Sequence, residues 1–338
     1  DAPPQDQASH ADFLKPRVKA AANSPISSKE AGKRARKGLS GRQMTRFVLT
    51  LVGKSAAVLE DSAQLVAAQA RAPESREIVE PKTALDLIYD NPANPQALLA
   101  NIRVLLAPVA IDWAFQPTSG RKKALLLADM DSTIIGQECI DELADLVGLK
   151  THVAAITERA MRGEIAFEPA LRERVALLKG LDASVPEKVI AERITITPGA
   201  RALVRTMRAN GAYTALVSGG FTAFTSRIAA TVGFDENRAN RLVIDAGKFA
   251  GLVEEPILGA EAKLSSVIEL RDARGLSKAQ TIAAGDGAND LPMLREAGLG
   301  VAFRAKPAVA AAADARIQHS DLSALLYAQG YARADFVA

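Results

Sequence analysis

Two aspartates one residue apart, Asp129 and Asp131, directly follow the apolar run Ala124–Ala128. Carboxylates this close repel each other unless a cation lies beside them, and carboxylate oxygens are the usual ligands of hard divalent ions. For the isolated fragment, a capped turn with Ser132 or Thr133 as the cap is the better explanation. The pair therefore indicates a metal site only if a second group of ligands supports it.

A second acidic loop supplies this support. It follows the apolar strand candidate Thr281–Ala284 and reads GDGANDLPM over residues 285–293. Its glycines permit tight turns, and Asp286, Asn289 and Asp290 bring oxygen ligands. Because ligands of an open parallel sheet lie beyond the carboxyl ends of its strands, we expect both loops to converge on one site. Magnesium suits such a site, whereas a helix cap made by these Asn and Asp side chains does not account for both loops.

Two further segments offer groups that bind phosphate. A third strand candidate, Ala212–Val217, ends in the hydroxyl of Ser218 and two glycines, the first of which is Gly219. Small residues let backbone N–H groups approach a phosphate oxygen, although a serine cap with a flexible turn has the same pattern. Lys263, early in the helical segment Ala260–Arg274, offers a positive charge, although most lysines on helices are simply solvated.

Strand and helix candidates alternate from Ala124 onward, which predicts an α/β fold with a parallel sheet covered by helices on both faces. One stretch interrupts the alternation: residues 138–195 are mostly helical and contain no clear strand candidate. We interpret this insertion as a lid, or cap, over the carboxylate loops. The sequence thus predicts a large α/β domain over residues 121–338.

The N-terminal third divides into two further parts. Residues 1–43 are rich in Ala, Ser, Pro and charge, which predicts a disordered extension or, alternatively, a basic targeting or docking arm, with Met44 as the natural start. Residues 44–120 predict a small α/β unit with a strand from Phe47 and a helix over Pro95–Leu106. A linker rich in Pro, Gly and charge joins this unit to the larger domain.

Composition narrows the class of protein. With 338 residues and 48% hydrophobic content, the chain is long enough for two domains with their own cores. A net charge of +3 and 4% aromatic residues argue against a dedicated nucleic-acid binder. The single Cys139 excludes an internal disulfide framework and fits a reducing, cytoplasmic setting. No apolar run approaches the roughly 20 residues that span a bilayer, so no membrane partner is expected.

The motifs DMDST, SGG, the helix lysine and GDGANDLPM resemble, in this order, the four motifs of the haloacid dehalogenase superfamily of phosphotransferases. Residues 124–330 resemble its phosphoserine phosphatase family in particular. This resemblance implies a Rossmann-like sheet with a helical cap, in which Asp129 is the nucleophile and Asp131 the general acid and base. It also implies that the phosphoryl group is held by Ser218, Gly219, Lys263 and Asn289. The implied magnesium ligands are Asp129, the backbone carbonyl of Asp131, Asp286 and Asp290.

The lid carries the residues that are expected to choose the substrate. Its apolar face, at helical spacing, consists of Phe167, Leu171, Val175 and Leu178. Arg174 lies at the edge of this face, where it can fork onto a carboxylate or, as the ordinary alternative, extend its head to solvent. The resemblance implies that Arg174 binds a substrate carboxylate, that Glu138 binds an ammonium group, and that Met161 and Phe167 close over the serine. Ordinary packing within the lid is the alternative for the last two.

These observations predict a magnesium-dependent phosphomonoesterase that releases L-serine from O-phospho-L-serine, the last step of L-serine biosynthesis. The alternative is action on another small amino-acid phosphate such as phosphohomoserine. Residues 44–120 resemble a divergent ACT domain, which implies either a module that binds a regulatory amino acid or a dimerisation unit without a ligand. A homodimer is therefore a further expectation.

Overall fold

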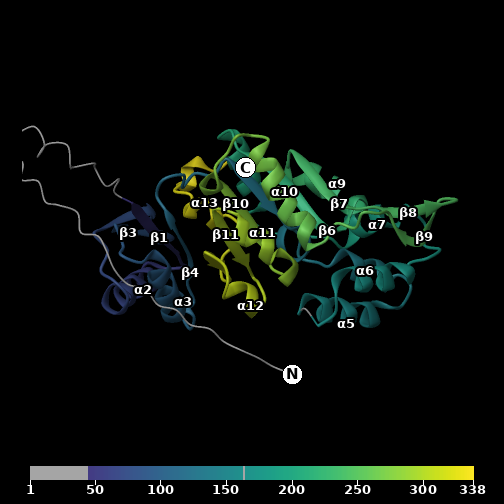
Figure 1. The fold of residues 1–338 in the computed structure, drawn as a ribbon, viewed down its shortest axis with the longest axis horizontal. Helices are drawn as coiled ribbons and strands as arrows, with labels where there is room; N and C mark the ends of the chain where they lie inside the picture. The colour runs from purple at the N-terminus through teal and green to yellow at the C-terminus, as the bar shows by residue number, and fades with distance from the viewer. Residues whose placement is uncertain (1–44, 163) are drawn as a thin grey trace, which may run out of the picture. The chain divides into compact units, whose positions relative to one another are not determined.

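The computed structural model of the chain describes residues 45–162 and 164–338 (Figure 1). The predicted disordered extension over residues 1–43 and the predicted start at Met44 lie outside the described residues. Among the helices that are described, none is long and apolar enough to cross a membrane.

The first described unit is a four-stranded antiparallel sheet with two helices. Its elements are β1 (Arg46–Val52), α2 (Ala56–Gln69), β2 (Ser75–Glu80), β3 (Ala84–Asp90), α3 (Pro95–Leu106) and β4 (Asp112–Pro117). The strand order β2-β3-β1-β4 gives the split βαββαβ arrangement. Helix α3 has the predicted bounds because Asn94 accepts a hydrogen bond from the Ala97 N–H (3.0 Å) and Pro95 occupies the first turn.

Strands β2 and β3 were not predicted from the sequence, for two different physical reasons. Strand β2 is an edge strand whose residues are mostly exposed, so it shows no apolar alternation. Strand β3 is buried on both faces and carries Asp86 in its middle, which breaks its apolar run. The prediction that residues 44–120 form an ACT-like module that binds an amino acid or dimerises stays a prediction.

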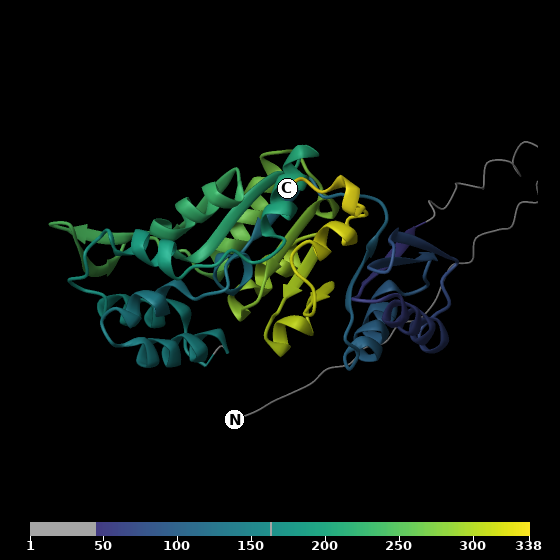
Figure 2. The ribbon, with the colours of Figure 1, turned by 180° about the vertical axis from the view of Figure 1, so that it is seen from behind.

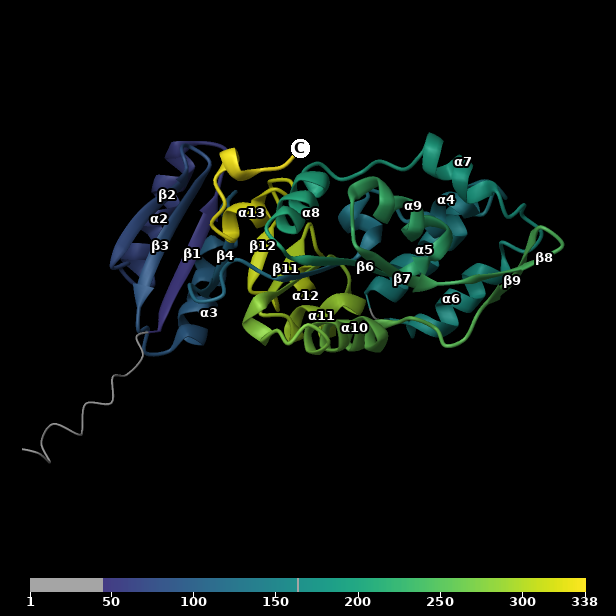
Figure 3. The same ribbon diagram turned by 90° about the horizontal axis from the view of Figure 1, so that it is seen from above.

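Six parallel strands form the rest of the ten-stranded sheet, in the order β12-β11-β10-β5-β6-β7. Their bounds are β5 (Leu125–Ala128), β6 (Tyr213–Phe221), β7 (Glu236–Asn240), β10 (Thr281–Gly285), β11 (Leu299–Phe303) and β12 (Ala315–Ile317). One face is covered by α8 (Ala200–Ala209), α9 (Thr222–Val232) and α13 (Ala324–Ala328). The other is covered by α10 (Ala260–Asp272), α11 (Leu291–Glu296) and α12 (Pro307–Ala310) (Figure 3). The predicted α/β fold is confirmed.

Strand β5 shows why the sheet lies between two helical layers. Leu125 and Leu127 join the core beneath α10 and α11, whereas Leu126 and Ala128 join the core beneath α8 and α9. A strand buried on both faces requires a continuous apolar run, as β5 has. Its neighbours β10 and β6 run parallel to it, with Ala128 level with Ala284, so the strands end at the same edge of the sheet.

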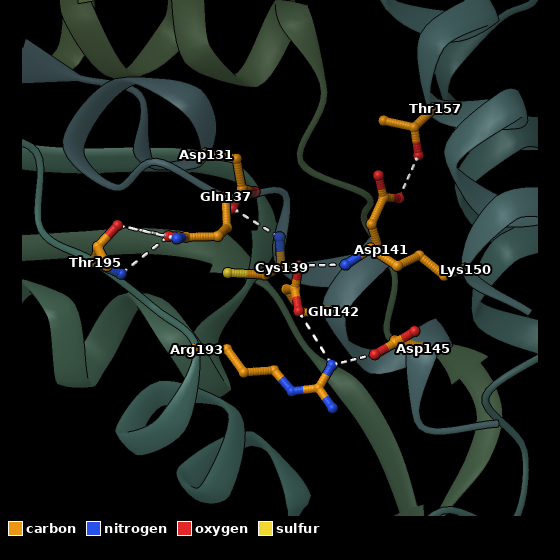
Figure 4. A network of polar contacts seen from close by, with 10 residues as sticks. All are labelled: Asp131, Gln137, Cys139, Asp141, Glu142, Asp145, Lys150, Thr157, Arg193 and Thr195. Atoms are coloured by element: carbon orange, nitrogen blue, oxygen red, sulfur yellow. Dashed lines mark hydrogen bonds and ion pairs between the residues drawn. The ribbon is translucent and has the colours of Figure 1, made fainter. Parts of the chain in front are cut away.

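The cap is inserted between β5 and β6, and its teal helices lie at the left in Figure 2. It contains α4 (Cys139–Asp145), α5 (Lys150–Met161), α6 (Phe167–Ala176) and α7 (Val185–Glu192). The side chains of Gln137 and Thr195 hydrogen-bond to each other where the chain leaves and re-enters the core (2.9 Å; Figure 4). The predicted helical insertion is thus present. An unpredicted hairpin, β8 (Leu242–Asp245) with β9 (Lys248–Val253), packs against α6 and extends the cap.

The two sheets are continuous because β4 pairs antiparallel with β12. Buried charges reinforce this junction. Asp86, 1% exposed, lies 2.6 Å from the Arg121 guanidinium and accepts a 2.7 Å hydrogen bond from the Thr50 hydroxyl. Arg121 also donates from Nε to the carbonyl of Ala328 at 2.9 Å. The predicted linker is therefore fixed by ionic contacts, and the predicted division into domains at residues 120 and 121 stays a prediction.

We expect Arg121→Ala to lower the free energy of unfolding by about 3 kcal/mol, because it leaves Asp86 charged and buried without its partner. Urea denaturation measures this loss. A matched control is Arg46→Ala, which breaks an exposed pair with Asp90 and is expected to cost far less. Equal losses in the two variants would show that the buried pair has no special role in joining the sheets.

Candidate active site

Asp129 stands at the carboxyl end of β5, directly beside β10. Its backbone N–H donates to the carbonyl of Ala284 at 3.0 Å, which fixes the start of the loop on the neighbouring strand. The chain then makes one tight turn over Met130–Ile134, in which Ser132 takes a left-handed φ of 54°. This turn carries the Asp131 carboxylate back to the start of the cap, where it accepts a hydrogen bond from the Cys139 N–H (3.1 Å). The two aspartates thereby face different neighbours.

The fully buried ammonium of Lys263 holds the two acidic loops together. Its Nζ lies 2.8 Å from an oxygen of Asp129 and 2.7 Å from an oxygen of Asp290. Burial alone lowers the pKa of Lys263, but the two adjacent carboxylates outweigh this effect and raise the pKa above its ordinary value. The lysine is therefore a permanent cation beneath the site, and the solvated alternative is wrong.

Three buried carboxylates gather around this single lysine. Ligand oxygens of Asp129, Asp286 and Asp290 all lie within 4.8 Å of one another. Burial, followed by repulsion between the carboxylates, raises the pKa of Asp286 to about 9 and that of Asp129 to about 7. An excess of hard, buried oxygen donors fits a divalent cation. The Asp131 carboxylate is not part of this group.

Both carboxylate oxygens of Asp290 already accept hydrogen bonds within the protein. One oxygen binds Lys263, and the other accepts from the N–H groups of Asp286 and Gly287, both at 3.1 Å. Gly285 is required here because a Cβ at this position would lie 2.4 Å from the Asp290 carboxyl carbon. Asp290 thus shapes the loop, while Asp286 and Asp129 have more oxygen capacity left for a metal ion.

The loop after β6 brings a hydroxyl and backbone N–H groups to the same edge. Ser218 is buried, and its hydroxyl accepts a hydrogen bond from the Gly220 N–H at 2.9 Å. The turn is held from behind by Asn240, whose amide donates to the carbonyls of Gly219 (2.9 Å) and Leu258 (3.1 Å). Asn240 was not predicted, because nothing in the sequence of an edge strand indicates such a contact.

A cavity of about 350 Å³ lies between the sheet edge and the cap. The predicted site residues that line it are Asp129, Asp131, Glu138, Phe167, Arg174, Ser218, Gly219, Asp286 and Asn289. Lys263 and Asp290 lie behind its wall. Met161 ends α5, but its side chain lies outside the described part of the structure. The cavity therefore joins the loops at the sheet edge of the core to the charged residues of the cap.

Glu138 points into this cavity from the start of α4. The Ser132 hydroxyl donates to its carboxylate at 2.6 Å, which gives that serine a contact that the sequence did not predict. Loss of hydration, followed by repulsion from Asp131, raises the pKa of Glu138 to about 8. Loss of hydration and repulsion from Asp129 likewise raise the pKa of Asp131 to about 7. A cationic group that entered the cavity would stabilise the ionised form of Glu138.

Arg174 also faces the cavity and does not extend to solvent. It is 5% exposed and donates from Nε to the Ala170 carbonyl and from Nη1 to the Thr157 hydroxyl, both at 2.9 Å. Its neighbour Arg172 lies on the surface and pairs with Glu255. The alternative that Arg174 carries its head to solvent is therefore wrong.

The ring of Phe167 brings the cap against the core. A Cβ added at Gly219 would lie 3.0 Å from this ring, and one added at Gly259 would lie 3.2 Å from it. Two glycines therefore make the flat surface that receives the ring. This contact closes one side of the cavity.

The chain is similar to a family of known proteins. A model of the haloacid dehalogenase-like hydrolases matches residues 126–295, about half of the chain. The chain is 46% identical over 227 residues to a phosphoserine phosphatase from Albidiferax ferrireducens, a match that covers 65% of this chain and 96% of the relative.

Solved structures show the same similarity. One is a substrate-bound phosphoserine phosphatase complex, with a TM-score of 0.58 and 40% identity over 61% of this chain and 97% of that chain. Another is a probable phosphoserine phosphatase from Vibrio cholerae in its unliganded form, with a TM-score of 0.65 and 30% identity. The second match covers 87% of this chain and 88% of the other.

We expect the metal-free protein to lose stability as the pH rises. Because the folded pKa of Asp286 is raised to about 9 from an ordinary value of 3.8, the folded state holds a proton that the unfolded state releases. The stabilisation that this proton gives is lost as the pH rises through about 9. Thermal unfolding in a chelator is therefore expected to shift down by several degrees between about pH 6 and pH 9.

Added Mg²⁺ is expected to reverse this shift, because a metal ion binds the deprotonated carboxylates. Asp286→Asn is the matched control, since a neutral amide replaces the titrating group. It is expected to flatten the pH dependence and to weaken the response to Mg²⁺. A variant that responds to pH and Mg²⁺ as the wild type does would contradict the assignment of Asp286.

Proposed function

The chain belongs to the haloacid dehalogenase-like hydrolase family, and we propose that it hydrolyses O-phospho-L-serine to L-serine and phosphate. One observation carries this proposal: Asp129, paired with the buried Lys263, lines the same cavity as the opposite charges of Glu138 and Arg174. The first pair suits phosphoryl transfer, and the second suits an amino acid. Its similarity to phosphoserine phosphatases supports the same substrate.

A metal ion is a feature of this family, and the residues present fit one. We propose Mg²⁺, held by Asp129, Asp286 and the backbone carbonyl of Asp131, with Asp290 in a supporting role. When bound, the ion neutralises charge on the phosphoryl oxygens and thereby lets a carboxylate approach the phosphorus atom. Such an ion also explains why three buried carboxylates share one lysine.

Asp129 acts as the nucleophile. Its carboxylate oxygen forms a bond to phosphorus while the bond from phosphorus to the serine oxygen breaks, which leaves an aspartyl-phosphate. Asp131 donates a proton to the departing serine oxygen and then removes a proton from the water that attacks the aspartyl-phosphate. A pKa of about 7 suits a group that must be protonated in one step and ionised in the next. Ser218, Gly219 and Asn289 hold the phosphoryl oxygens, whereas Lys263 adds its positive charge from behind the cavity wall through its contact with Asp129.

The cap recognises the amino-acid part of the substrate. Glu138 binds the ammonium group, whose positive charge favours the ionised carboxylate despite its raised pKa. Arg174 binds the carboxylate with the N–H groups that its protein contacts leave free. Phe167 closes the cavity over the serine, and the same contact for Met161 stays a prediction.

We expect Asp129→Asn to reduce phosphate release from phosphoserine by at least about 10³-fold, because an amide cannot attack phosphorus. Release of inorganic phosphate with Mg²⁺ present measures this loss. Asp245→Asn, at an exposed site on the hairpin of the cap, is the matched control and is expected to keep wild-type turnover. A fully active Asp129→Asn variant would exclude this residue as the nucleophile.

A panel of phosphomonoesters separates the substrate from its alternative. Phosphoserine is expected to have the highest kcat/KM, because Glu138 can then bind its ammonium group and Arg174 its carboxylate. Faster turnover of phosphohomoserine would support the alternative substrate with the same catalytic groups. Faster turnover of a sugar phosphate would exclude both amino-acid assignments, since neither Glu138 nor Arg174 would then have a charged partner.

A further inference from the structure

Thr157 lies on α5 and contacts neither the phosphate-binding motifs nor the metal-binding carboxylates through any hydrogen bond among the described residues. It is 4% exposed, and its Oγ1 accepts the hydrogen bond from Arg174 Nη1 at 2.9 Å. The same oxygen lies 3.0 Å from Asp141 Oδ1 (Figure 4) and 3.0 Å from the carbonyl oxygen of Val153. One hydroxyl thus lies between an arginine and an aspartate of the cap.

The hydrogen-bonding capacity of this hydroxyl fixes its direction. Arg174 has only donors, so Oγ1 must accept from it, and the single hydroxyl hydrogen goes to Asp141 or to Val153. The Thr157 hydroxyl therefore lies between two opposite charges, and no ion pair joins Asp141 to Arg174 in the described part of the structure.

The remaining hydrogens of Arg174 are the ones available to a ligand. Nε is committed to the Ala170 carbonyl and one Nη1 hydrogen to Thr157. Within residues 45–162 and 164–338, Nη2 has no hydrogen-bond partner, and the Arg174 side chain lines the cavity. The two protein contacts thus hold the guanidinium plane and leave its free edge toward the substrate space.

Loss of the hydroxyl would change what this guanidinium binds. A buried arginine hydrogen without an acceptor is costly, and Asp141, which contacts the same Thr157 hydroxyl as Arg174, is a carboxylate that can replace it. A direct pair with Asp141 would draw Arg174 away from the cavity and neutralise it. We propose that Thr157 is a positioning residue that keeps Arg174 directed at the substrate carboxylate, and this inference rests on the proposed function.

The test compares two substrates that differ only in the group that Arg174 would bind. O-phospho-L-serine has a carboxylate, whereas O-phosphoethanolamine has the same phosphate and ammonium groups without it. Thr157→Val keeps the shape of the side chain and removes the hydroxyl. We expect it to raise the KM for phosphoserine about tenfold, with kcat changed less than about twofold and with phosphoethanolamine turnover unchanged.

Two further variants separate positioning from packing. Thr157→Ser restores the hydroxyl and is expected to return the KM for phosphoserine to within about twofold of the wild type. Thr206→Val removes another fully buried helical hydroxyl, on α8, and is expected to leave the ratio of the two substrates unchanged. Rescue by serine with no effect at Thr206 supports the proposal.

Two results would overturn it in different ways. Equal losses with both substrates in Thr157→Val would show that the residue serves only the packing of the cap, while the proposed function stands. A wild-type enzyme that turns over phosphoethanolamine as efficiently as phosphoserine would show that Arg174 does not bind the substrate carboxylate. That second result would overturn the substrate assignment and this inference together.

Discussion

The ammonium of Lys263, held between Asp129 and Asp290, is the interaction on which the site depends. A fully buried cation is tolerated only when carboxylates surround it, and these carboxylates come from the ends of two different strands. The parallel register of β5 and β10 places those ends side by side. The loop after β10 then has little conformational freedom. The Asp290 carboxylate also accepts from the Asp286 N–H of this loop, and Gly285 leaves room for the carboxyl group.

This buried pairing leaves more carboxylates than cations, and this imbalance suits the chemistry of the family. Three carboxylates around one lysine can hold a divalent cation in place of the protons that they otherwise keep, and such an ion would prepare the site for an anionic phosphoryl group. The cap selects the amino-acid part of the substrate, since Glu138 suits a cationic group and Arg174 an anionic one. One cavity thus presents a complementary charge to each of the three charged groups of an amino-acid phosphate. The contact of Phe167 with two glycines joins the cap, which carries Glu138 and Arg174, to the core, which carries the carboxylates.

The sequence predicted the parts of this site that local pattern determines. The acidic loops, the serine turn and Lys263 were predicted because each follows a strand or begins a helix, and ligand sites lie at such places in a parallel sheet. The contacts of Ser132, Thr157 and Asn240 were not predicted, because they join residues brought together only by tertiary packing. Exposed or interrupted strands escaped prediction for a related reason: their apolar alternation is weak.

The central claim is that Asp129 becomes covalently phosphorylated during turnover. The most direct measurement is to mix the enzyme and Mg²⁺ with phosphoserine labelled on phosphorus, quench in acid within milliseconds, and locate the label by peptide mass spectrometry. The account predicts transient, acid-stable label on the peptide that contains Asp129, formed and lost at rates that match turnover. Label on another residue, or phosphate release with no labelled protein under conditions that capture a single turnover, would contradict it.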